Sequence, residues 1–530
     1  MARKHLAKFA WGQWLRITEI ALILFLILAF VAVRSYRIDF PLADWHSFRQ
    51  VDTASVTREF VRDGIDILHP RYHDVSNIQS GELNLEGWRM VEFPLLNALT
   101  ASILLTVPEL DLVVTSRAVS IAASFVSLLC LLYLSRHLYG RVVMFVVGAM
   151  FTFLPYSIYY SRVVLPEPFM VMWALLAAVA LQVWGMGVAR KKTVWKHWIW
   201  LLLAGVFFAV ALLVKPVAIF FVPFYIGIFW RYRRWRVLPW VTAAVVLGLS
   251  VLPLIWWRSW IQQFPSGIPA SDWLLNGNGI RLKPAWWRWL FADRIGRLMF
   301  GYWGASFLLI GWVAGVRAWT YKKLRTPRQW VQAVFAYKDA WLREEGALVF
   351  GGLGMLAYLV IFATGNVQHD YYQVPLVPIL VLLWARGAVW LVRQGSGVWQ
   401  KIELAGVVGV IALFSMAFSW YEVSGWFNVN NWAYVSAGEA IQRLTPEDAL
   451  IIAPGFGDTT FLFQTERRGW PIGFEIEDKI AAGAQYYAST AYDDEARRLE
   501  AEYTVLEKTD DYIIIDLQQP QRTEDEYQTE

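Results

Sequence analysis

Cysteine is almost absent from this chain of 530 residues, in which Cys130 is the one example. It lies within an apolar segment, so the sequence excludes both a disulfide framework and a thiolate metal cluster. Charged residues are also scarce at 17%, whereas hydrophobic residues make up 57% and the mean hydropathy is +0.39. A soluble protein could not cover so much apolar surface with polar groups, and the sequence therefore predicts a protein that crosses a membrane many times.

The basic residues that give the chain its formal net charge of +5 occur in short bursts between apolar segments. This distribution favours cytoplasmic loops of a membrane protein over a nucleic-acid-binding surface, since Lys and Arg accumulate on the inner side of membranes. The bursts fall at 136–141, 190–196, 231–236, 317–328 and 386–401. The high content of aromatic residues, including 31 Trp, is typical of side chains that lie at membrane interfaces.

The apolar runs predict an all-α membrane module. The first run, 17–33, follows a basic N-terminus and no small-residue cleavage pattern follows it, so we expect a retained span with its N-terminus inside. Further spans are predicted at 113–134, 142–156, 169–188, 197–214, 216–230, 237–257, 298–319, 347–364, 374–392 and 404–420. The run 94–107 would reach only about 21 Å across a layer of about 30 Å, so it is either re-entrant or a short tilted span.

Placing all five basic bursts inside requires that 94–107 does not cross, which gives about eleven crossings; the full range is about 11 to 13 transmembrane helices. On this topology the loops 36–93 and 258–297 and the polar tail are extracytoplasmic. We divide the chain into a membrane module, 1–421, and a C-terminal α/β domain, 422–530. The segment NWAYVSAGEAIQRL in this tail is helix-like, while ALIIAP and DYIIID are strand-like.

The loop 36–93 contains more ionisable side chains than a connector needs. It begins around PLADWHSFRQVDTASVTREF, and its ionisable residues include Asp44, His46, Arg49, Asp52, Arg58, Glu59, Arg89 and Glu92. The apolar residues of 51–61 recur at helical spacing with charges between them, which predicts a helix along the membrane surface. We therefore interpret 36–93 as the active-site loop.

A second set of polar side chains lies at the predicted outer ends of the spans. Its members include Arg117, Arg162, Glu167, Lys215, Arg258 and the stretch His369-Asp370-Tyr371-Tyr372. For any one of them, snorkelling or an interfacial ion pair is a sufficient explanation. A charge at the centre of a span costs about 2.5 to 3.5 kcal/mol, however, so a set that converges on an acidic loop is informative. Carboxylates would supply a general base, and the cations and Tyr hydroxyls a site for an anionic group.

Several of these segments together resemble the glycosyltransferase C superfamily. After the first span, Asp44-Trp45-His46-Ser47-Phe48-Arg49 forms a D-aromatic-x-x-x-R pattern, and EFPLLN, YYSRVVLPEP, LVKP and HDYYQVPLVP follow in order. They are similar to the branch around the protein O-mannosyltransferases and aminoarabinose transferases. The resemblance covers residues 1 to about 421. It implies a GT-C-like fold and an integral membrane enzyme that transfers a sugar from a polyprenyl-phosphate donor to an acceptor outside the cytoplasm.

The resemblance also implies roles for individual residues. Asp44 matches the catalytic Asp of the family, which takes the proton of the acceptor hydroxyl, and Asp52 is a second candidate for this base. The donor phosphate would be bound by residues drawn from Arg117, Arg162, Lys215, His369 and Tyr372. The acceptor or the loop would be positioned by His46, Arg49, Glu92 and Glu167. Two departures stand out: Trp45 follows Asp44 where many relatives have a second acidic residue, and Glu92 precedes Phe93-Pro94 where some relatives have Lys-Pro.

The expected reaction is a direct displacement at the anomeric carbon, hence with inversion. The chain contains no D-x-D motif, which argues against a nucleotide-sugar donor. No metal site is predicted, and a divalent cation is optional because lipid phosphate is already a good leaving group. The sugar is open, as is the acceptor, which could be a protein, a lipid or a glycan. The compact loops favour a prokaryotic inner or plasma membrane.

The alternative function is a multispan transporter or a flippase of a lipid-linked sugar or small solute. Transporters commonly have polar groups at broken helices near the membrane midplane and two related halves. Here the one mid-span break lies at Lys215-Pro216, and no internal repeat is evident. The tail could help to choose the acceptor, as its position beside the predicted outer loops suggests.

Overall fold

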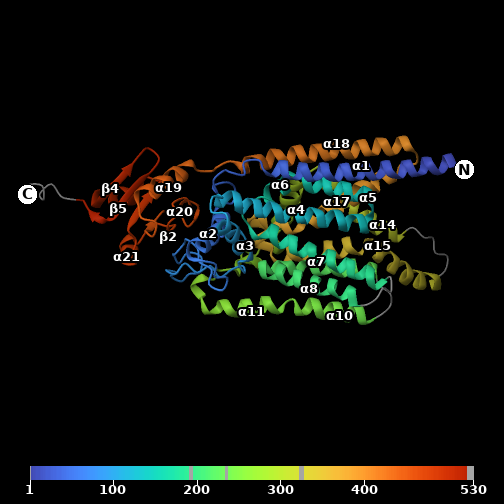
Figure 1. Ribbon diagram of the computed structural model, residues 1–530, viewed down its shortest axis with the longest axis horizontal. Coiled ribbons are helices and arrows are strands. Elements are labelled where there is room, and N and C mark those ends of the chain that lie inside the picture. The colour runs from blue at the N-terminus through green and yellow to red at the C-terminus, as the bar shows by residue number, and fades with distance from the viewer. Residues whose placement is uncertain (1, 190–194, 233–236, 321–326, 522–530) are drawn as a thin grey trace, which may run out of the picture.

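The computed structural model describes residues 2–189, 195–232, 237–320 and 327–521, with side chains for all of these except 2–16, 195–196, 314–320 and 327–341. Long helices run side by side in a bundle, and a small α/β unit lies at one end of it (Figure 1). The N-terminus lies at the opposite end of the bundle (Figure 1). Helix α2 (Ser47–Asp63) and the loop that follows it lie between the bundle and the C-terminal unit (Figure 1).

The bundle contains α1 (Ala2–Arg34), α4 (Leu112–Tyr139), α5 (Arg141–Phe153), α7 (Pro166–Ala189), α8 (Trp195–Val214), α9 (Val222–Arg231), α10 (Val237–Leu249), α11 (Leu252–Trp260), α14 (Ala305–Thr320), α15 (Pro327–Ile361), α17 (Val377–Arg393) and α18 (Val398–Val423). Short segments connect these helices: α3 (Leu95–Thr106), α6 (Pro155–Tyr160), η1 (Pro216–Phe221), η2 (Ile261–Gln263), η3 (Pro265–Gly267), α12 (Trp273–Asn276), η4 (Ile280–Leu282), α13 (Pro284–Trp287), the π-helix η5 (Arg288–Met299), α16 (Ala363–Gln368), η6 (Asp370–Leu376) and η7 (Ser424–Phe427).

The predicted polytopic all-α fold is confirmed. Within the described residues, eight helical stretches are long and apolar enough to cross a membrane. The predicted spans 142–156 and 216–230 and the short run 94–107 form shorter apolar helices, at Arg141–Phe153, Pro216–Arg231 and Leu95–Thr106. The predicted span 298–319 is divided between η5 and α14. Parts of three basic bursts, namely 190–194, 233–236 and 321–326, lie outside the described residues.

Proline explains where several of these helices end. It lacks a backbone N–H and its ring clashes with the preceding turn, so it is tolerated at the start of a helix and not in its middle. Pro155 therefore begins α6 directly after α5, and Pro216 begins the 3-10 segment η1 after α8. The break at Pro216 leaves Lys215, an extended residue, between the two segments.

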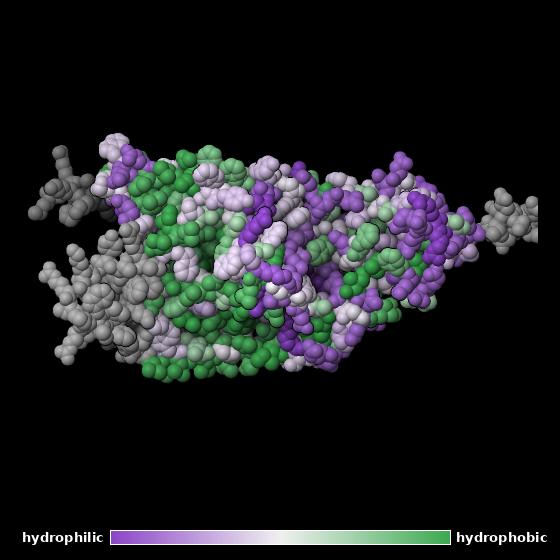
Figure 2. Space-filling model, turned by 180° about the vertical axis from the view of Figure 1, so that it is seen from behind, coloured by the Kyte–Doolittle hydropathy of each residue, from purple (hydrophilic) through white to green (hydrophobic). Residues whose placement is uncertain are grey.

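A band of apolar side chains covers the bundle, while the C-terminal end of the molecule is hydrophilic (Figure 2). Exposed members of this band include Leu28 of α1, Leu238 of α10 and Leu413 of α18, each about two-thirds exposed at 70%, 68% and 69%. Such a surface is unfavourable in water and is what a helix bundle presents to lipid. The protein is therefore an integral membrane protein.

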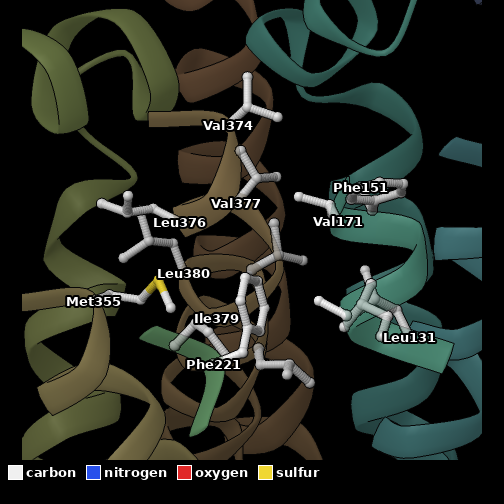
Figure 3. Close-up of a cluster of buried hydrophobic side chains, with 14 of the residues drawn as sticks. Leu131, Phe151, Val171, Phe221, Met355, Val374, Leu376, Val377, Ile379 and Leu380 are labelled. Carbon is white, nitrogen blue, oxygen red and sulfur yellow. The ribbon is translucent and has the colours of Figure 1, made fainter. Parts of the chain in front are cut away.

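The centre of the bundle is packed with aliphatic and aromatic side chains. Figure 3 shows Leu131, Phe151, Val171, Phe221 and Leu380 converging from α4, α5, α7, η1 and α17, all of them buried. Interdigitation of this kind fixes the helices that carry the polar residues at the outer end of the bundle.

The predicted helix within 51–61 is present as α2, which packs against α3 and against α20 (Thr460–Gln464) of the C-terminal unit. It is buried along most of its length rather than half exposed on a surface, because the C-terminal unit covers it. Hydrophobic contacts between Leu42, Val51 and Ala54 of the loop, Val164, and Phe463 of α20 contribute to this packing.

The C-terminal unit is a small α/β structure, as the tail composition predicted. It contains α19 (Trp432–Leu444), β1 (Leu450–Ile452), α20, β2 (Arg468–Trp470), α21 (Ile476–Ala481), β3 (Tyr486–Ser489), α22 (Asp494–Glu502), β4 (Tyr503–Lys508) and β5 (Ile513–Pro520). The strand order is β2-β1-β3-β5-β4; β1 is parallel to β2 and β3, while β5 is antiparallel to β3 and β4.

Candidate active site

Asp44 lies fully buried just before α2 and is held by three side chains. Its Oδ2 lies 3.2 Å from Nη2 of Arg117 and 3.6 Å from Nη2 of Arg162, and its Oδ1 accepts a 2.7 Å hydrogen bond from Nε2 of Gln50. Burial raises the pKa of the Asp44 carboxyl, and the two guanidinium groups oppose that rise. The carboxylate is thus an internal counter-ion for two arginines.

Both arginines also hold the chain between α1 and Asp44. Arg117 donates a 2.9 Å hydrogen bond from Nη1 to the carbonyl of Ile38 and another to Phe40, while Arg162 donates to the carbonyls of Tyr36 and Arg37 at 2.6 and 3.0 Å. Neither side chain is accessible to solvent. The structure therefore brings Arg117 and Arg162 to Asp44, where their Nη groups face protein oxygens rather than an open site.

Asp52, by contrast, lines a cavity. This cavity is small: about 20 Å³ is open to the centre of a water molecule, within about 400 Å³ of space between atoms that includes open solvent. Its polar lining consists of Arg49, Asp52, Thr53, Arg89, Glu92 and Asn97. Oδ2 of Asp52 forms a 2.9 Å ion pair with Arg89 and accepts a 3.1 Å hydrogen bond from Gln79. Oδ1 accepts a 2.7 Å hydrogen bond from the hydroxyl of Thr459 in the C-terminal unit.

A chain of alternating charges leads from this cavity into the bundle. Arg49 forms an ion pair with Glu92, whose Oε1 also lies 3.8 Å from Nζ of Lys215, and Lys215 forms an ion pair with Glu167 at the start of α7. Burial alone would raise the pKa of Glu92, but the charges of Arg49 and Lys215 outweigh it and lower that pKa to about 2. Nζ of Lys215 lies 5.3 Å from the ring centroid of Tyr372.

His46 and the HDYYQ stretch meet beside this chain of charges. Nε2 of His46 lies 2.5 Å from Oδ1 of Asp370, which also accepts hydrogen bonds from the Tyr160 hydroxyl, while its Oδ2 accepts a 3.1 Å bond from the Trp45 indole. His369 lies 5.6 Å from His46, between ring centroids. Burial, reinforced by His46, lowers the pKa of His369 to about 4, so its imidazole is neutral at physiological pH.

The predicted residues thus fall into two neighbouring groups. Asp52, Arg49 and Glu92 line the cavity, and Lys215, Glu167, Tyr372, His369 and His46 lie next to it, whereas Asp44, Arg117 and Arg162 form a closed cluster on the other side of the α2 N-terminus. Sequence interpretation gave no role to Asp370, Gln50, Gln79 or Thr459. The position of Asp370, a charged residue at the start of an apolar run, could have indicated a functional role. The other three are polar residues whose sequence positions indicate no such role.

This arrangement provides a carboxylate at a cavity wall with several cations close by. Such a combination can accept a proton from a hydroxyl and neutralise a departing anion. Within the described residues, no group of three or more His, Cys, Asp or Glu is placed to hold a metal ion.

Comparison with known proteins supports the predicted resemblance. Residues 67–268 match the model of the family described as dolichyl-phosphate-mannose-protein mannosyltransferase. No curated protein sequence matches the chain significantly.

Solved structures share the fold at low sequence identity. ArnT from Cupriavidus metallidurans bound to undecaprenyl phosphate is 12% identical, over 93% of this chain and 97% of that chain, with a TM-score of 0.60. AglB, an oligosaccharyltransferase from Archaeoglobus fulgidus, in complex with an inhibitory peptide and a dolichol-phosphate is 11% identical, over 92% and 73%, with a TM-score of 0.54. A structure of the Archaeoglobus fulgidus oligosaccharyltransferase with Zn and sulfate is 11% identical, over 88% and 68%, with a TM-score of 0.53.

The chain therefore has the GT-C fold that the resemblance predicted. The matched stretch, 67–268, is similar to the protein mannosyltransferase family and spans less than half of the chain.

Proposed function

We propose that the protein transfers a sugar from a polyprenyl-phosphate donor to a hydroxyl acceptor at the extracytoplasmic face of a prokaryotic inner or plasma membrane. The observation that carries this proposal is the cavity in which the Asp52 carboxylate lies beside Arg49, Arg89 and the Lys215 ammonium network. The GT-C fold and the lipid phosphates bound by ArnT and AglB support it. Sugar and acceptor are left open.

Asp52 is the general base in this proposal, and its cavity position is the reason. The carboxylate removes the proton of the acceptor hydroxyl, the oxygen attacks the anomeric carbon, and the bond from that carbon to the phosphate oxygen breaks with inversion. Asp44, the first candidate from the sequence, is enclosed by Arg117, Arg162 and Gln50 and does not line the cavity. It is assigned a supporting role, in which it fixes the start of α2.

The donor phosphate is assigned to Lys215 and Arg49, with the Tyr372 ring beside Lys215. Both cations are bound to carboxylates, so an incoming phosphate would replace part of their contacts with Glu92 and Glu167. Arg117 and Arg162, which the sequence also suggested for this role, have their donors directed at Asp44 and at backbone carbonyls. Neutral His369 would contribute a hydrogen bond rather than a charge, and a divalent cation stays optional.

The direct test is sugar transfer by purified protein in lipid nanodiscs. Polyprenyl-phosphate monosaccharides with a radiolabelled sugar would be supplied with a membrane extract as the source of acceptor, and the anomeric configuration of the product determined by NMR. The expected result is labelled product from one donor, inverted relative to that donor, and at least about 100-fold less product with Asp52→Asn. Specific uptake or flipping in liposomes without turnover of any donor would support the transporter alternative instead.

A further inference from the structure

Thr459, in the C-terminal unit, contacts the proposed base directly. Its hydroxyl donates a 2.7 Å hydrogen bond to Oδ1 of Asp52, and its side chain is 1% exposed. The two partners of Oδ2, Arg89 and Gln79, both belong to the loop after α2. Within the described part of the chain, Thr459 is the one side chain within hydrogen-bond distance of Oδ1, so each carboxylate oxygen is held by a different region of the protein.

The backbone around Thr459 is fixed by local hydrogen bonds. Thr459 immediately precedes α20, its carbonyl accepts a 2.9 Å bond from the amide of Phe463, and the amide of Thr460 donates a 2.8 Å bond to the Asp458 carboxylate. These bonds fix the backbone at Thr459, and its hydroxyl faces two acceptors on α2, Oδ1 of Asp52 at 2.7 Å and the carbonyl of Phe48 at 3.4 Å.

The C-terminal unit is attached to α2 at further points on either side of Asp52. The Thr460 hydroxyl donates a 2.8 Å bond to the Ser47 hydroxyl, and Nη1 of Arg58 donates a 3.0 Å bond to the carbonyl of Phe463. These contacts lie along α2 on either side of Asp52, so the C-terminal unit is docked on α2 at several points and does not depend on any one of them.

We propose that Thr459 is a positioning residue for the general base, so that the C-terminal unit completes the active site formed by the membrane module. A hydrogen bond to Oδ1 limits rotation of the carboxylate and so keeps the proton-accepting group in one orientation. This inference rests on the proposed function. It gives the C-terminal unit a part in the chemical step, which is separate from any choice of acceptor.

The charged groups around Asp52 come from three regions. Arg89 and Asp74 belong to the loop, Arg49 belongs to α2, and Asp458 belongs to the C-terminal unit. None of them would change in a variant at Thr459. Loss of the hydroxyl removes its 2.7 Å hydrogen bond to Asp52 and its longer, 3.4 Å contact with the carbonyl of Phe48.

Three variants test the proposal. Thr459→Val removes the hydroxyl at nearly constant volume, Thr459→Ser retains it, and Thr460→Val removes a neighbouring buried hydroxyl that contacts α2 but not Asp52. With Thr459→Val we expect kcat to fall about 10-fold, the size of a hydrogen bond to a charged group, with the donor KM changed by less than about two-fold. Thr459→Ser and Thr460→Val should behave as the unaltered protein, and thermal unfolding would show that all three are folded.

Two results would overturn the positioning role. One is wild-type turnover by Thr459→Val while Asp52→Asn is inactive. The other is an equal loss in Thr459→Val and Thr460→Val that Thr459→Ser does not restore, which would indicate a general effect on docking. If Asp52→Asn instead retained full transfer, Asp52 would not be the base. The inference about Thr459 would then fail because the proposed function is wrong, and the activity of Asp52→Asn distinguishes this case from the two results above.

Discussion

Asp44 precedes the N-terminus of α2 and Asp52 lies within α2, and their different surroundings predict different roles. Asp44 compensates two buried guanidinium groups, whereas Asp52 lines a cavity. Removing one partner of a buried ion pair typically costs 3–5 kcal/mol, because the remaining charge is left uncompensated. We therefore expect Asp44→Asn to lower the free energy of unfolding by about 3 kcal/mol.

Thermal unfolding in detergent, measured on Asp44→Asn and Asp52→Asn side by side, checks this expectation. The melting temperature should fall with both variants, and further with Asp44→Asn, which leaves two fully buried arginines without their counter-ion, than with Asp52→Asn, which leaves Arg89. Transfer activity per folded molecule should fall further with Asp52→Asn than with Asp44→Asn. A stable but inactive Asp44→Asn would show that Asp44, and not Asp52, is the base.

Glu92 gives the site a dependence on pH. Its pKa is lowered from 4.5 to about 2 in the folded protein, chiefly by Arg49 and Lys215 against the opposing effect of burial. A carboxyl with a lowered pKa stabilises the fold above its unfolded pKa, and this stabilisation is lost as the pH falls from about 4.5 towards 2. The difference in melting temperature between the unaltered protein and Glu92→Gln should therefore be largest near neutral pH and should narrow below pH 4. A constant difference from pH 7 to pH 3 would contradict the ion-pair account.

Sequence interpretation succeeded where a single segment carries the information and was incomplete where distant segments meet. The apolar runs, the helix in 51–61 and the strands ALIIAP and DYIIID could be predicted because hydrophobic periodicity is local. The pairing of Asp44 with Arg117 and Arg162, and of Asp52 with Thr459, depends on how the bundle and the C-terminal unit pack. Residue type alone therefore identified the charged groups but not which of the two carboxylates faces the cavity.

At the scale of elements, the close approach of α14 and α17 depends on glycine. A Cβ atom at Gly387 would lie 2.7 Å from the backbone nitrogen of Gly311 and closer still to the carbonyl of Phe307. Neither neighbour is a flexible side chain, so a larger residue would force the helices apart. This contact matters for the site because α17 continues from η6, which carries Asp370 and Tyr372.

Gly387→Leu should accordingly destabilise the protein by about 3 kcal/mol, the upper end of the usual cost of overpacking. Gly409→Leu on α18 is the matched control, because nothing lies within 4 Å of a Cβ at that exposed position. The melting temperatures of the two variants and of the unaltered protein test this expectation, and only Gly387→Leu should melt at a clearly lower temperature. Equal melting temperatures for the two variants would mean that α14 and α17 are not held at this separation.

At the scale of the whole molecule, the proposal requires the active-site loop and the C-terminal unit to lie outside the cytoplasm. Helix α18 begins at Val398, within the basic stretch 386–401, and leads into the C-terminal unit. Its first residues therefore lie at the opposite end of the bundle, where α1 also begins (Figure 1). Lys and Arg in short loops are retained on the cytoplasmic side. The two ends of the bundle should therefore face different compartments.

The single buried cysteine makes this orientation measurable. On a Cys130→Ser background, Glu82→Cys places a thiol on the exposed part of the active-site loop, and Ser396→Cys places one in the exposed turn between α17 and α18. A membrane-impermeant maleimide added to intact cells should label Glu82→Cys at once and Ser396→Cys only after the membrane is permeabilised. Labelling of Ser396→Cys alone in intact cells would invert the topology, and it would place Asp52, together with Thr459, on the side of the membrane where the proposed reaction does not occur.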